Sequence, residues 1–447
     1  MGRIQFPDDF RFGVATSAFQ IEGATRTDGR GESIWDRFCR TPGRIERGEN
    51  ADHACDHYHR FEDDVALMRE LGIRSYRFSI AWPRIQPDGR APVNTRGLDF
   101  YQRLIDALLE AGIRPLPTLY HWDLPQALEK TGGWTARDTA GRFAEYAGLM
   151  AGVLGDRVES WLIFNEPWIF TVMGYLLGVH APGRTGFANF ARAAHTVALA
   201  QGDAFRAIRA MQPSAEIGSA FSMSPCEPAG DRDEDAEAAL RYDRFFNDWF
   251  LEPALSGHYP DAFPDGVPEE AMGIERDDMA RCRAPLDFIG VNLYTRTRVR
   301  AARGQGGIEA VPVDAPEGPT TDMGWEVWPR ALRDMLIRLH ERHDGPILEV
   351  TENGCAYDDA PDARGVYDDA RRVEYLEAHL AAVAEARAAG AKVRGYHVWS
   401  LLDNFEWAHG YAKRFGIVHV DFRTGRRTPK RSARWYAEVI AAGGFEA

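Results

Sequence analysis

The stretch Val158-Glu159-Ser160-Trp161-Leu162-Ile163-Phe164-Asn165-Glu166-Pro167 decides the fold, because a short apolar run ends there in a carboxylate. A second stretch, Pro346-Ile347-Leu348-Glu349-Val350-Thr351-Glu352-Asn353-Gly354, ends in the same way. Apolar runs bounded by turn formers are typical of strands that are buried on both faces of a parallel sheet. Each glutamate is therefore predicted at the carboxyl end of a strand. In a barrel of alternating strands and helices, that end is the catalytic face.

Similar strand-like runs recur along the whole chain. They cover residues 12–17, 74–81, 114–121, 158–164, 216–221, 288–294, 347–352 and 395–401. Segments between them carry apolar residues at helical spacing, at 60–71, 97–111, 137–154, 191–211, 329–343 and 369–389. Eight strands alternating with helices predict an α/β fold, a (β/α)8 barrel whose long loops after the strands form the active-site pocket.

We expect residues 1–447 to form a single domain, because no low-complexity linker or short-period repeat interrupts the pattern. Two segments, 20–50 and 303–324, depart from the strand and helix pattern and are rich in glycine with charge or proline. Long loops inside a compact domain are usually functional or disordered. The second segment follows the sixth predicted strand, so we expect it at the substrate entrance; an idle surface loop is the alternative.

The composition argues against several classes of partner. With 53 basic and 67 acidic residues, the formal charge of −14 repels phosphate backbones and anionic membranes, so neither nucleic acid nor membrane is expected. No apolar run reaches about 18 residues, the length of a membrane span. Five scattered cysteines without a Cys-x-x-Cys pair favour a reducing, cytoplasmic location. The sequence does not indicate an oligomeric state.

Two carboxylates can cleave a glycosidic bond if one protonates the leaving oxygen and the other attacks or activates water. Glu166 and Glu352 could fill these places, although only barrel closure would bring them together. Arg77, within the second predicted strand, could favour the ionised form of Glu352, or could instead pair with a structural carboxylate. Further polar and aromatic residues suited to binding sugars occur at predicted strand ends: Gln20, His121, Trp122, Asn165, Asn292, Tyr294, Trp399, Glu406 and Trp407.

Other chemistries find less support in the sequence. His57 and His59 could suggest a metal, but no third ligand occurs at a matching strand end, so capping and surface packing explain them better. Cys355 lies three residues after Glu352 but has no base in its local sequence, so we expect a small buried residue. Neither a metal nor another cofactor is predicted.

The residues together resemble glycoside hydrolase family 1, the retaining β-glucosidases built on a TIM barrel. The resemblance runs nearly end to end and includes both glutamate stretches. It also includes Asn292, Tyr294 and the segments 10–17, 20–23, 76–84, 121–125, 323–325, 399–407, 414–416 and 428–430. Ile169 and Cys355 depart from the usual pattern, but neither has an assigned role.

The resemblance implies a role for each matching residue. Glu166 is expected to be the acid/base and Glu352 the nucleophile, with Arg77 and Tyr294 beside it. It implies β-glucosides and oligosaccharides as small-molecule substrates, and carboxylates about 5 to 5.5 Å apart. Residues expected to bind the non-reducing sugar are Gln20, His121, Trp122, Asn165, Asn292, Tyr294, Trp399, Glu406, Trp407 and Phe415, and those on the leaving-group side are Trp168, His180 and Trp325.

Glu406 bears on the choice between subfamilies. Relatives that cleave phosphorylated disaccharides place a small hydroxyl residue here, whereas a carboxylate would repel a sugar phosphate. Free glucosides are therefore expected over their 6-phosphates. Galactosides and fucosides stay open as alternatives, because those sugars use the same hydroxyl-binding residues with slightly different geometry. A catalytically silent sugar-binding barrel is expected to have lost one glutamate, and this chain keeps both.

Overall fold

Eight parallel strands form a closed barrel in the computed structural model, which describes residues 2–90, 92–304 and 307–446. The barrel strands are β2 (Arg11–Ala15), β3 (Ser75–Ser79), β4 (Arg114–Tyr120), β5 (Ser160–Asn165), β6 (Glu216–Ser222), β8 (Phe288–Asn292), β11 (Ile347–Asn353) and β12 (Lys392–Trp399). The last strand pairs with the first, with Gly395 opposite Arg11 and Trp399 opposite Ala15. The predicted (β/α)8 barrel is confirmed, and each predicted strand boundary lies within three residues of the observed one.

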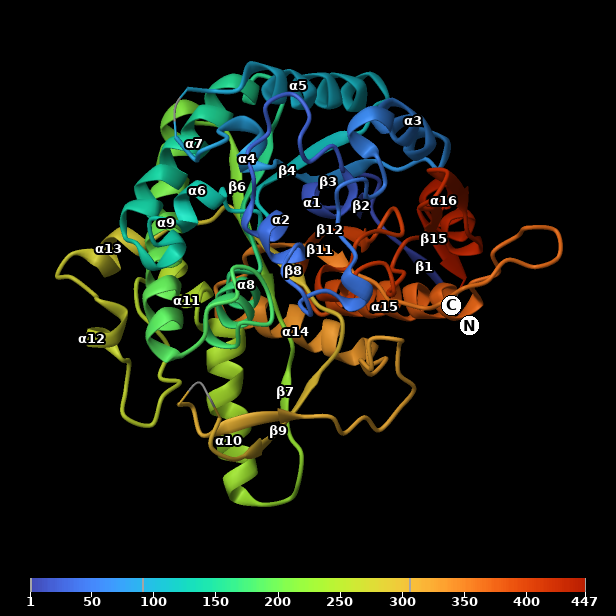
Figure 1. Ribbon diagram of the computed structural model, residues 1–447. Helices are drawn as coiled ribbons and strands as arrows, with labels where there is room; N and C mark the ends of the chain where they lie inside the picture. Colours follow the sequence, from blue (N-terminus) through green and yellow to red (C-terminus); the bar gives the residue numbers. More distant parts are fainter. Residues whose placement is uncertain (1, 91, 305–306, 447) are drawn as a thin grey trace.

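Long helices surround the barrel (Figure 1). They are α3 (His57–Glu70), α5 (Thr95–Glu110), α7 (Asp138–Leu154), α9 (Phe187–Met211), α14 (Pro329–Arg342), α15 (Ala370–Ala388) and α16 (Arg431–Ala442). The largest difference from prediction is at α9, which begins four residues before the expected 191. Gly186, at φ 96°, turns the chain into this helix. Phe187 and Phe190 then pack on each other, with ring centroids 6.1 Å apart, so the first turn of α9 contributes apolar side chains to the packing.

Shorter elements lie in the connections. The short helices are α1 (Ala18–Ile21), α2 (Ile34–Cys39), α4 (Trp82–Ile85), α6 (Gln126–Glu129), α8 (Pro167–Thr171), α10 (Asp233–Asp243), α11 (Leu251–Leu255), α12 (Glu269–Met272) and α13 (Asp278–Cys282). Single turns of other helix types are η1 (Glu46–Gly48), η2 (Gly133–Thr135), η3 (Val172–Leu176), η4 (Arg244–Asp248) and η5 (Trp407–His409). Small sheets are formed by β1 (Arg3–Gln5) with β15 (Gly444–Glu446), by β13 (Val418–Asp421) with β14 (Arg426–Pro429), and by β7 (Cys226–Pro228), β9 (Thr297–Ala301) and β10 (Ala310–Val313).

The two segments that depart from the strand and helix pattern are partly ordered by local structure. Residues 20–50 contain α2, where Ser33 Oγ accepts the Asp36 amide at 3.1 Å and Asp36 accepts the Ser33 amide at 2.7 Å. This reciprocal pair is a capping box, which stabilises the start of a short helix. Residues 303–324 contain β10, which pairs antiparallel with β9. Gln305 and Gly306 lie outside the described residues.

Of the two histidines His57 and His59, for which surface packing was expected, only His59 lies at the surface. His57 is buried and its Nδ1 lies 2.8 Å from Asp64, whereas the exposed His59 contacts Asp56 at 2.6 Å. Arg427 also donates to Asp64, at 2.7 Å, so His57 belongs to a buried polar network rather than to surface packing. In the part of the chain that the structure describes, no cluster of three or more His, Cys, Asp or Glu residues has the arrangement of a metal site.

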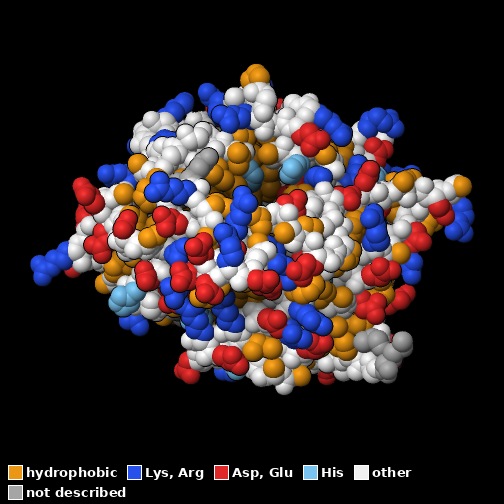
Figure 2. All heavy atoms as spheres, turned by 90° about the horizontal axis from the view of Figure 1, so that it is seen from below, with side chains coloured by type: hydrophobic (Ala, Val, Ile, Leu, Met, Phe, Trp, Pro, Cys, Tyr) orange, Lys and Arg blue, Asp and Glu red, His pale blue; other side chains and the backbone are white. Residues whose placement is uncertain are grey.

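The amino end of the barrel holds a cluster of charged side chains. Arg394 donates to Glu349 at 2.6 Å and to Glu216 at 2.9 Å, and Arg11 reaches the same two carboxylates. Polar groups at this end of a βα barrel usually serve stability. Figure 2 shows acidic and basic side chains interspersed on one outer face, with hydrophobic side chains bordering a hollow. Among the described residues, no helix has the length and apolar character needed to cross a membrane.

Candidate active site

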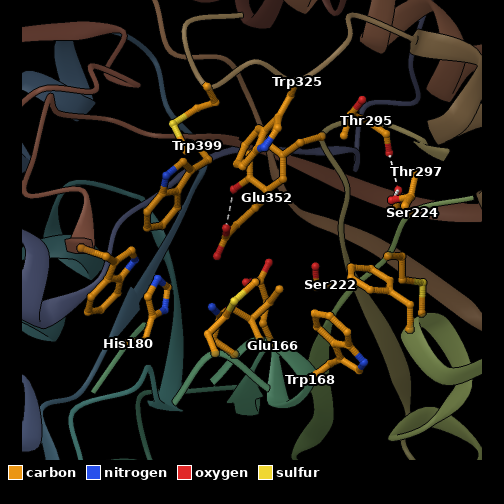
Figure 3. A pocket seen from close by; sticks show the side chains of 18 of the residues that line it. Glu166, Trp168, His180, Ser222, Ser224, Thr295, Thr297, Trp325, Glu352 and Trp399 are labelled. Carbon is orange, nitrogen blue, oxygen red and sulfur yellow. Dashed lines mark hydrogen bonds between the residues drawn. The ribbon is translucent and has the colours of Figure 1, made fainter. Parts of the chain in front are cut away.

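A cavity of about 460 Å³ lies at the carboxyl ends of the barrel strands. Glu166, directly after β5, and Glu352, near the end of β11, point toward one another across it (Figure 3). The structure thus brings together two carboxyls 186 positions apart in the sequence. Of the predicted site residues, the cavity is lined by His121, Trp122, Asn165, Glu166, Trp168, His180, Tyr294, Trp325, Glu352, Trp399, Glu406, Trp407 and Phe415.

Three predicted residues lie behind the cavity wall. Asn292 is fully buried and donates to Glu166 Oε1 at 2.9 Å. Gln20 is also fully buried, and its amide nitrogen lies 3.3 Å from Glu406 Oε2. Arg77, predicted to support Glu352, is buried as well. These residues contact side chains that line the site: Gln20 contacts Glu406, Asn292 contacts Glu166, and Arg77 contacts Glu352.

Glu352 accepts two short hydrogen bonds. Arg77 donates to Oε1 at 2.5 Å and Tyr294 donates to Oε2 at 2.5 Å. Arg77 also donates to Asn165 Oδ1 at 2.6 Å, which holds the guanidinium in place. Burial raises the pKa of Glu352, while the charge of Arg77 and the Tyr294 hydroxyl lower it. Hydrogen bonds from an arginine and a phenol favour the ionised carboxylate, so Glu352 is the first of the two glutamates to lose its proton.

Glu166 has a different environment. Its amide donates to Ala220 O at 2.8 Å, and Pro167 begins α8 immediately after it. The backbone has φ 48°, a left-handed conformation that is unfavourable for a residue with a side chain and is concentrated at functional sites. Burial, followed by repulsion from Glu352, raises the pKa of Glu166 to about 8. The two environments therefore favour the protonated form at Glu166 and the ionised form at Glu352.

Aromatic rings form one wall of the cavity. His121 stacks beside Trp399 with centroids 5.8 Å apart and beside Trp407 at 5.8 Å, while Trp122 packs on Trp407 at 4.4 Å. Burial and the charge of Arg77 hold the pKa of His121 well below its usual range, so the imidazole is neutral. Its Nδ1 has no hydrogen-bond partner among the described residues. A neutral ring with an unused nitrogen is suited to binding a hydroxyl group.

The chain segment that carries Glu406 is fixed from behind by a buried carboxylate. Asp403 accepts hydrogen bonds from Lys430 Nζ at 3.0 Å and from the Gly416 amide at 3.0 Å, and Arg414 donates to it at 2.9 Å. Asp403 and Lys430 are fully buried. Breaking one partner of such a group leaves an uncompensated charge, which is strongly destabilising. This network connects the 414–416 and 428–430 motifs to the segment that carries Glu406, and Phe415 of the first motif itself lines the cavity.

Glycine follows the Glu352 motif for a steric reason. A Cβ on Gly354 would lie 1.8 Å from the carbonyl oxygen of Trp399, so a larger residue would push the two strand ends apart. Cys355, next in sequence, is buried, and burial raises the pKa of its thiol to about 12. A thiol in that state is a poor nucleophile.

The opposite wall is apolar and contains residues that the sequence patterns did not single out as site residues. Trp168 packs on Phe246 with ring centroids 4.4 Å apart. Ile169, Met173, Met223 and Tyr242 also line the cavity, as do Ser222, Ser224, Thr295, Thr297, Pro312, Met323 and His409. These residues come from loops, helices and small strands between the motifs, so no local pattern marks them. Among them, Ile169 had drawn attention as a departure from the family pattern, and Met323 belongs to the 323–325 motif.

The pKa of Glu166 predicts a pH profile. If Glu166 is the proton donor that the family resemblance implies, kcat/KM for the expected β-glucoside substrate should fall as pH rises through about 8, approaching tenfold per pH unit. At low pH the rate falls as Glu352 becomes protonated. The pH dependence of kcat/KM reports the free enzyme, so steady-state kinetics between pH 4 and 10 test this directly. A profile that stays flat up to pH 10 would contradict the assignment.

Asp123, in the turn next to the site, predicts an effect on stability. Both carboxyl oxygens are buried and lack a hydrogen-bond partner within residues 2–90, 92–304 and 307–446. Burial raises the pKa of Asp123 from the ordinary 3.8 to about 8, so the folded chain binds more protons than the unfolded chain between these values. Stability therefore declines as pH rises through that window. The Tm of Asp123→Asn relative to the parent should rise by about 4 °C between pH 5 and pH 8; an equal difference at both pH values would refute this.

Comparison with known proteins gives one family over the whole chain. The model of glycosyl hydrolase family 1 matches residues 2–445. Beta-glucosidase A of Acetivibrio thermocellus is 44% identical over 448 residues, covering all of both chains. A bifunctional beta-D-glucosidase/beta-D-fucosidase of Bifidobacterium breve is 41% identical, with 98% of each chain covered. The family 1 β-glucosidase structure from Thermotoga maritima superposes with a TM-score of 0.96 at 42% identity, over all of both chains. This chain therefore belongs to glycosyl hydrolase family 1 and is a glycoside hydrolase.

Proposed function

We propose that the chain is a retaining β-glucosidase that removes the non-reducing β-D-glucosyl residue from oligosaccharides and from aryl or alkyl glucosides. The observation that carries this proposal is the contrast between two buried carboxyls. Arg77 and Tyr294 stabilise the anion of Glu352, whereas burial and that anion raise the pKa of Glu166 to about 8. A retaining glycosidase needs one ionised and one protonated carboxyl.

In the proposed first step, Glu352 attacks the anomeric carbon while Glu166 transfers its proton to the departing oxygen. The C–O bond to the leaving group breaks and a glycosyl ester on Glu352 forms, with inverted configuration. Esterification removes the negative charge that raised the pKa of Glu166. Glu166, ionised by that proton transfer and kept ionised by the lower pKa, takes a proton from water. The water oxygen bonds to the anomeric carbon from the other face as the bond to Glu352 breaks, which releases β-glucose and restores the Glu352 carboxylate. We expect the carboxylates to lie about 5 to 5.5 Å apart, the separation of retaining enzymes.

The glucosyl ring is proposed to bind on the aromatic wall, with Trp399 beneath it and His121, Asn165, Glu406 and Trp407 contacting hydroxyl groups. Asn165 supports this role, because it already joins Arg77 and His121, at 2.6 and 3.0 Å. A hydroxyl bound to Asn165 would be connected through Arg77 to Glu352, the proposed nucleophile. Trp122 and Phe415 complete the pocket around this ring, and Gln20 and Asn292 orient Glu406 and Glu166 from behind.

Glu406 supports free glucosides over their 6-phosphates. The side chain lines the cavity, and burial together with Glu352 raises its pKa to about 8. A dianionic phosphate beside Glu406 would be repelled by its buried carboxylate, or would require that carboxyl to stay protonated. The negative charge of Glu352 would add to the repulsion. A second specificity, for β-fucosides or β-galactosides, is supported by the relative named as both glucosidase and fucosidase.

A panel of p-nitrophenyl β-glycosides tests the proposal. The glucoside, galactoside, fucoside and glucoside 6-phosphate would be compared by kcat/KM under one buffer condition. We expect the glucoside to exceed the 6-phosphate by at least about tenfold, the effect of about 1.4 kcal/mol of charge repulsion. NMR monitors which anomer of glucose appears first. If β-glucose is the first product, the reaction is retaining. Release of α-glucose first, or activity confined to the 6-phosphate, would overturn it.

We also propose that residues 1–447 form one domain and that the protein is cytoplasmic. Pairing of the first barrel strand with the last supports the single domain, since the barrel uses nearly the full length of the chain. All five cysteines are free, and four of them are buried, which supports a reducing compartment.

A further inference from the structure

The strand that carries Glu352 contains one extra residue just before it. Val350 lies opposite Val291 of β8. Two positions later, Glu352 lies opposite Asn292, the next residue of β8, so β11 advances by two residues where β8 advances by one. A bulge of this kind bends a strand, re-aims its side chains and interrupts the regular ladder. The end of β11 therefore needs contacts other than strand pairing to fix Glu352.

Asn353, the last residue of β11, supplies some of these contacts. It is fully buried, and its Nδ2 donates to the Leu293 carbonyl at 2.6 Å, while its Oδ1 accepts the Tyr396 hydroxyl at 2.5 Å. The Leu293 amide donates in turn to the Glu352 carbonyl at 3.1 Å. The end of β11 is thus joined to the residue that precedes Tyr294 in sequence.

Tyr375, on α15, completes this arrangement. Its hydroxyl donates to the Tyr294 carbonyl at 3.0 Å and accepts from Asn353 Nδ2 at 3.2 Å. The side chain is buried and does not line the cavity. Because α15 lies outside the barrel (Figure 1), one of the surrounding helices reaches the back of the site with a single hydroxyl.

The ring of Tyr375 is itself held in place. It stacks on His379, one helical turn later, with ring centroids 3.8 Å apart, and His379 Nδ1 lies 2.7 Å from the Tyr375 carbonyl oxygen. A carbonyl only accepts, so Nδ1 of His379 carries the proton. Burial holds the pKa of Tyr375 well above its usual range, so the hydroxyl keeps its proton and stays a donor.

Tyr375 can act on Glu352 through one neighbour. The ionisable side chains that face Glu352 are Arg77 from β3, Glu166 after β5, Tyr294 after β8 and Glu406 after β12. Within the described part of the chain, Tyr375 bonds to Tyr294 and to none of the other three. Tyr294 donates to Glu352 Oε2 at 2.5 Å. Loss of the Tyr375 hydroxyl would therefore reach Glu352 by displacing the phenol of Tyr294.

We propose that Tyr375 is a positioning residue for the proposed reaction: its hydroxyl fixes the backbone of Tyr294 and thereby keeps the Tyr294 phenol hydrogen-bonded to Glu352. This inference rests on the proposed function, because it concerns the proposed nucleophile. A short hydrogen bond to an anion is strong, and it weakens steeply when its angle departs from linear. Tyr375 thus helps to stabilise the Glu352 anion without contacting the substrate.

The test is Tyr375→Phe, which removes the hydroxyl and keeps the ring that stacks on His379. A weaker bond from Tyr294 favours the protonated form of Glu352, so the acidic limb of kcat/KM for p-nitrophenyl β-glucoside should move up by about 0.5 pH unit. At the pH optimum, kcat should fall by about tenfold while KM stays within about twofold, because positioning of the nucleophile is lost rather than substrate binding. Steady-state kinetics between pH 4 and pH 8 measure both effects.

Tyr375→Met makes the same test if the phenylalanine variant does not fold, because methionine fills the space without a hydrogen-bond donor. The matched control is Tyr436→Phe. Tyr436 is also fully buried, its hydroxyl lies 3.1 Å from the Gly13 carbonyl and 3.2 Å from the Tyr396 carbonyl, and it does not line the cavity. This variant should lower Tm as Tyr375→Phe does, since each loses a buried hydroxyl, but it should leave the acidic limb in place.

A double variant shows whether Tyr375 acts through Tyr294. Tyr294→Phe removes the phenol hydroxyl that donates to Glu352, so it should move the acidic limb upward by itself. In that background, Tyr375→Phe should add no further shift, because the group that it positions is already gone. A purely structural role of Tyr375 would instead give the same additional loss in both backgrounds.

Three results would overturn the inference: an acidic limb that stays in place in Tyr375→Phe, an equal shift in Tyr436→Phe, or a further shift in the double variant. Inactivity of the parent on p-nitrophenyl β-glucoside would contradict the proposed function itself. The pH profiles therefore distinguish failure of the positioning role from failure of the proposed function.

Discussion

Glu352→Gly is expected to lower kcat/KM for p-nitrophenyl β-glucoside by on the order of 10⁴-fold or more, the scale seen when a covalent catalyst is removed. The residue accepts hydrogen bonds from Arg77 and Tyr294, which hold its oxygens toward the cavity. Glycine leaves a space beside these donors that azide can enter. A single displacement by azide gives the α-glucosyl azide, whereas two displacements would give the β product.

The control for this variant is Asp358→Gly, an exposed carboxylate on the loop that follows the same strand. It should keep full activity, because its exposed side chain does not line the cavity. NMR of the azide product decides the stereochemistry. Undiminished activity in Glu352→Gly, or a β-glucosyl azide from it, would show that another group is the nucleophile.

Glu166→Gln is expected to lower kcat/KM for cellobiose by about 10²- to 10⁴-fold, the usual contribution of general acid catalysis. A sugar alkoxide leaves poorly without a proton, whereas dinitrophenolate needs none. Formation of the glycosyl ester from 2,4-dinitrophenyl glucoside should therefore change little, while its hydrolysis slows because water lacks a base. Azide, which needs no base, should restore turnover and yield the β-glucosyl azide.

The pH profile of the same variant gives an independent check. Because the alkaline limb near pH 8 is assigned to Glu166, the parent should show it on cellobiose, whose leaving group needs the proton, and Glu166→Gln should lack it on the same substrate. Asn292 donates to Glu166 at 2.9 Å and can reorient toward the glutamine carbonyl, so the fold around the site should be kept. Retention of the alkaline limb, or equal losses on cellobiose and the dinitrophenyl glucoside, would argue against Glu166 as the acid.

Most of the fold could be predicted from the sequence because the relevant signals are local. Apolar runs of six to eight residues mark strands whatever lies elsewhere in the chain, and helical spacing marks the outer helices. The predicted positions of Glu166 and Glu352 at strand ends are confirmed. The eight predicted strands form the closed barrel that their number indicates. The early start of α9 and the strand β10 were not predicted, since both depend on distant packing: Phe187 lies against Phe263, and β10 needs β9 as a partner.

The site itself was only partly predictable. Motifs identified the residues that line the aromatic wall, but they did not show that Gln20 and Asn292 lie behind it. The apolar wall with Met173 and Phe246 carries no recognisable pattern. These residues come from loops and small secondary elements, where a cavity is defined by which segments meet rather than by the spacing of residues along one segment.

By itself, the sequence determined the barrel, its strand ends and the two carboxylates, because hydrophobic periodicity and motifs act over a few neighbouring positions. Only the tertiary structure decided how those carboxylates differ. Arg77 lies 275 positions from Glu352 but donates to it at 2.5 Å, and burial raises the pKa of Glu166 to about 8. Protonation depends on charge, hydrogen bonding and exclusion of water across space. The proposed roles of the two glutamates, which have identical side chains, therefore depend on the folded chain.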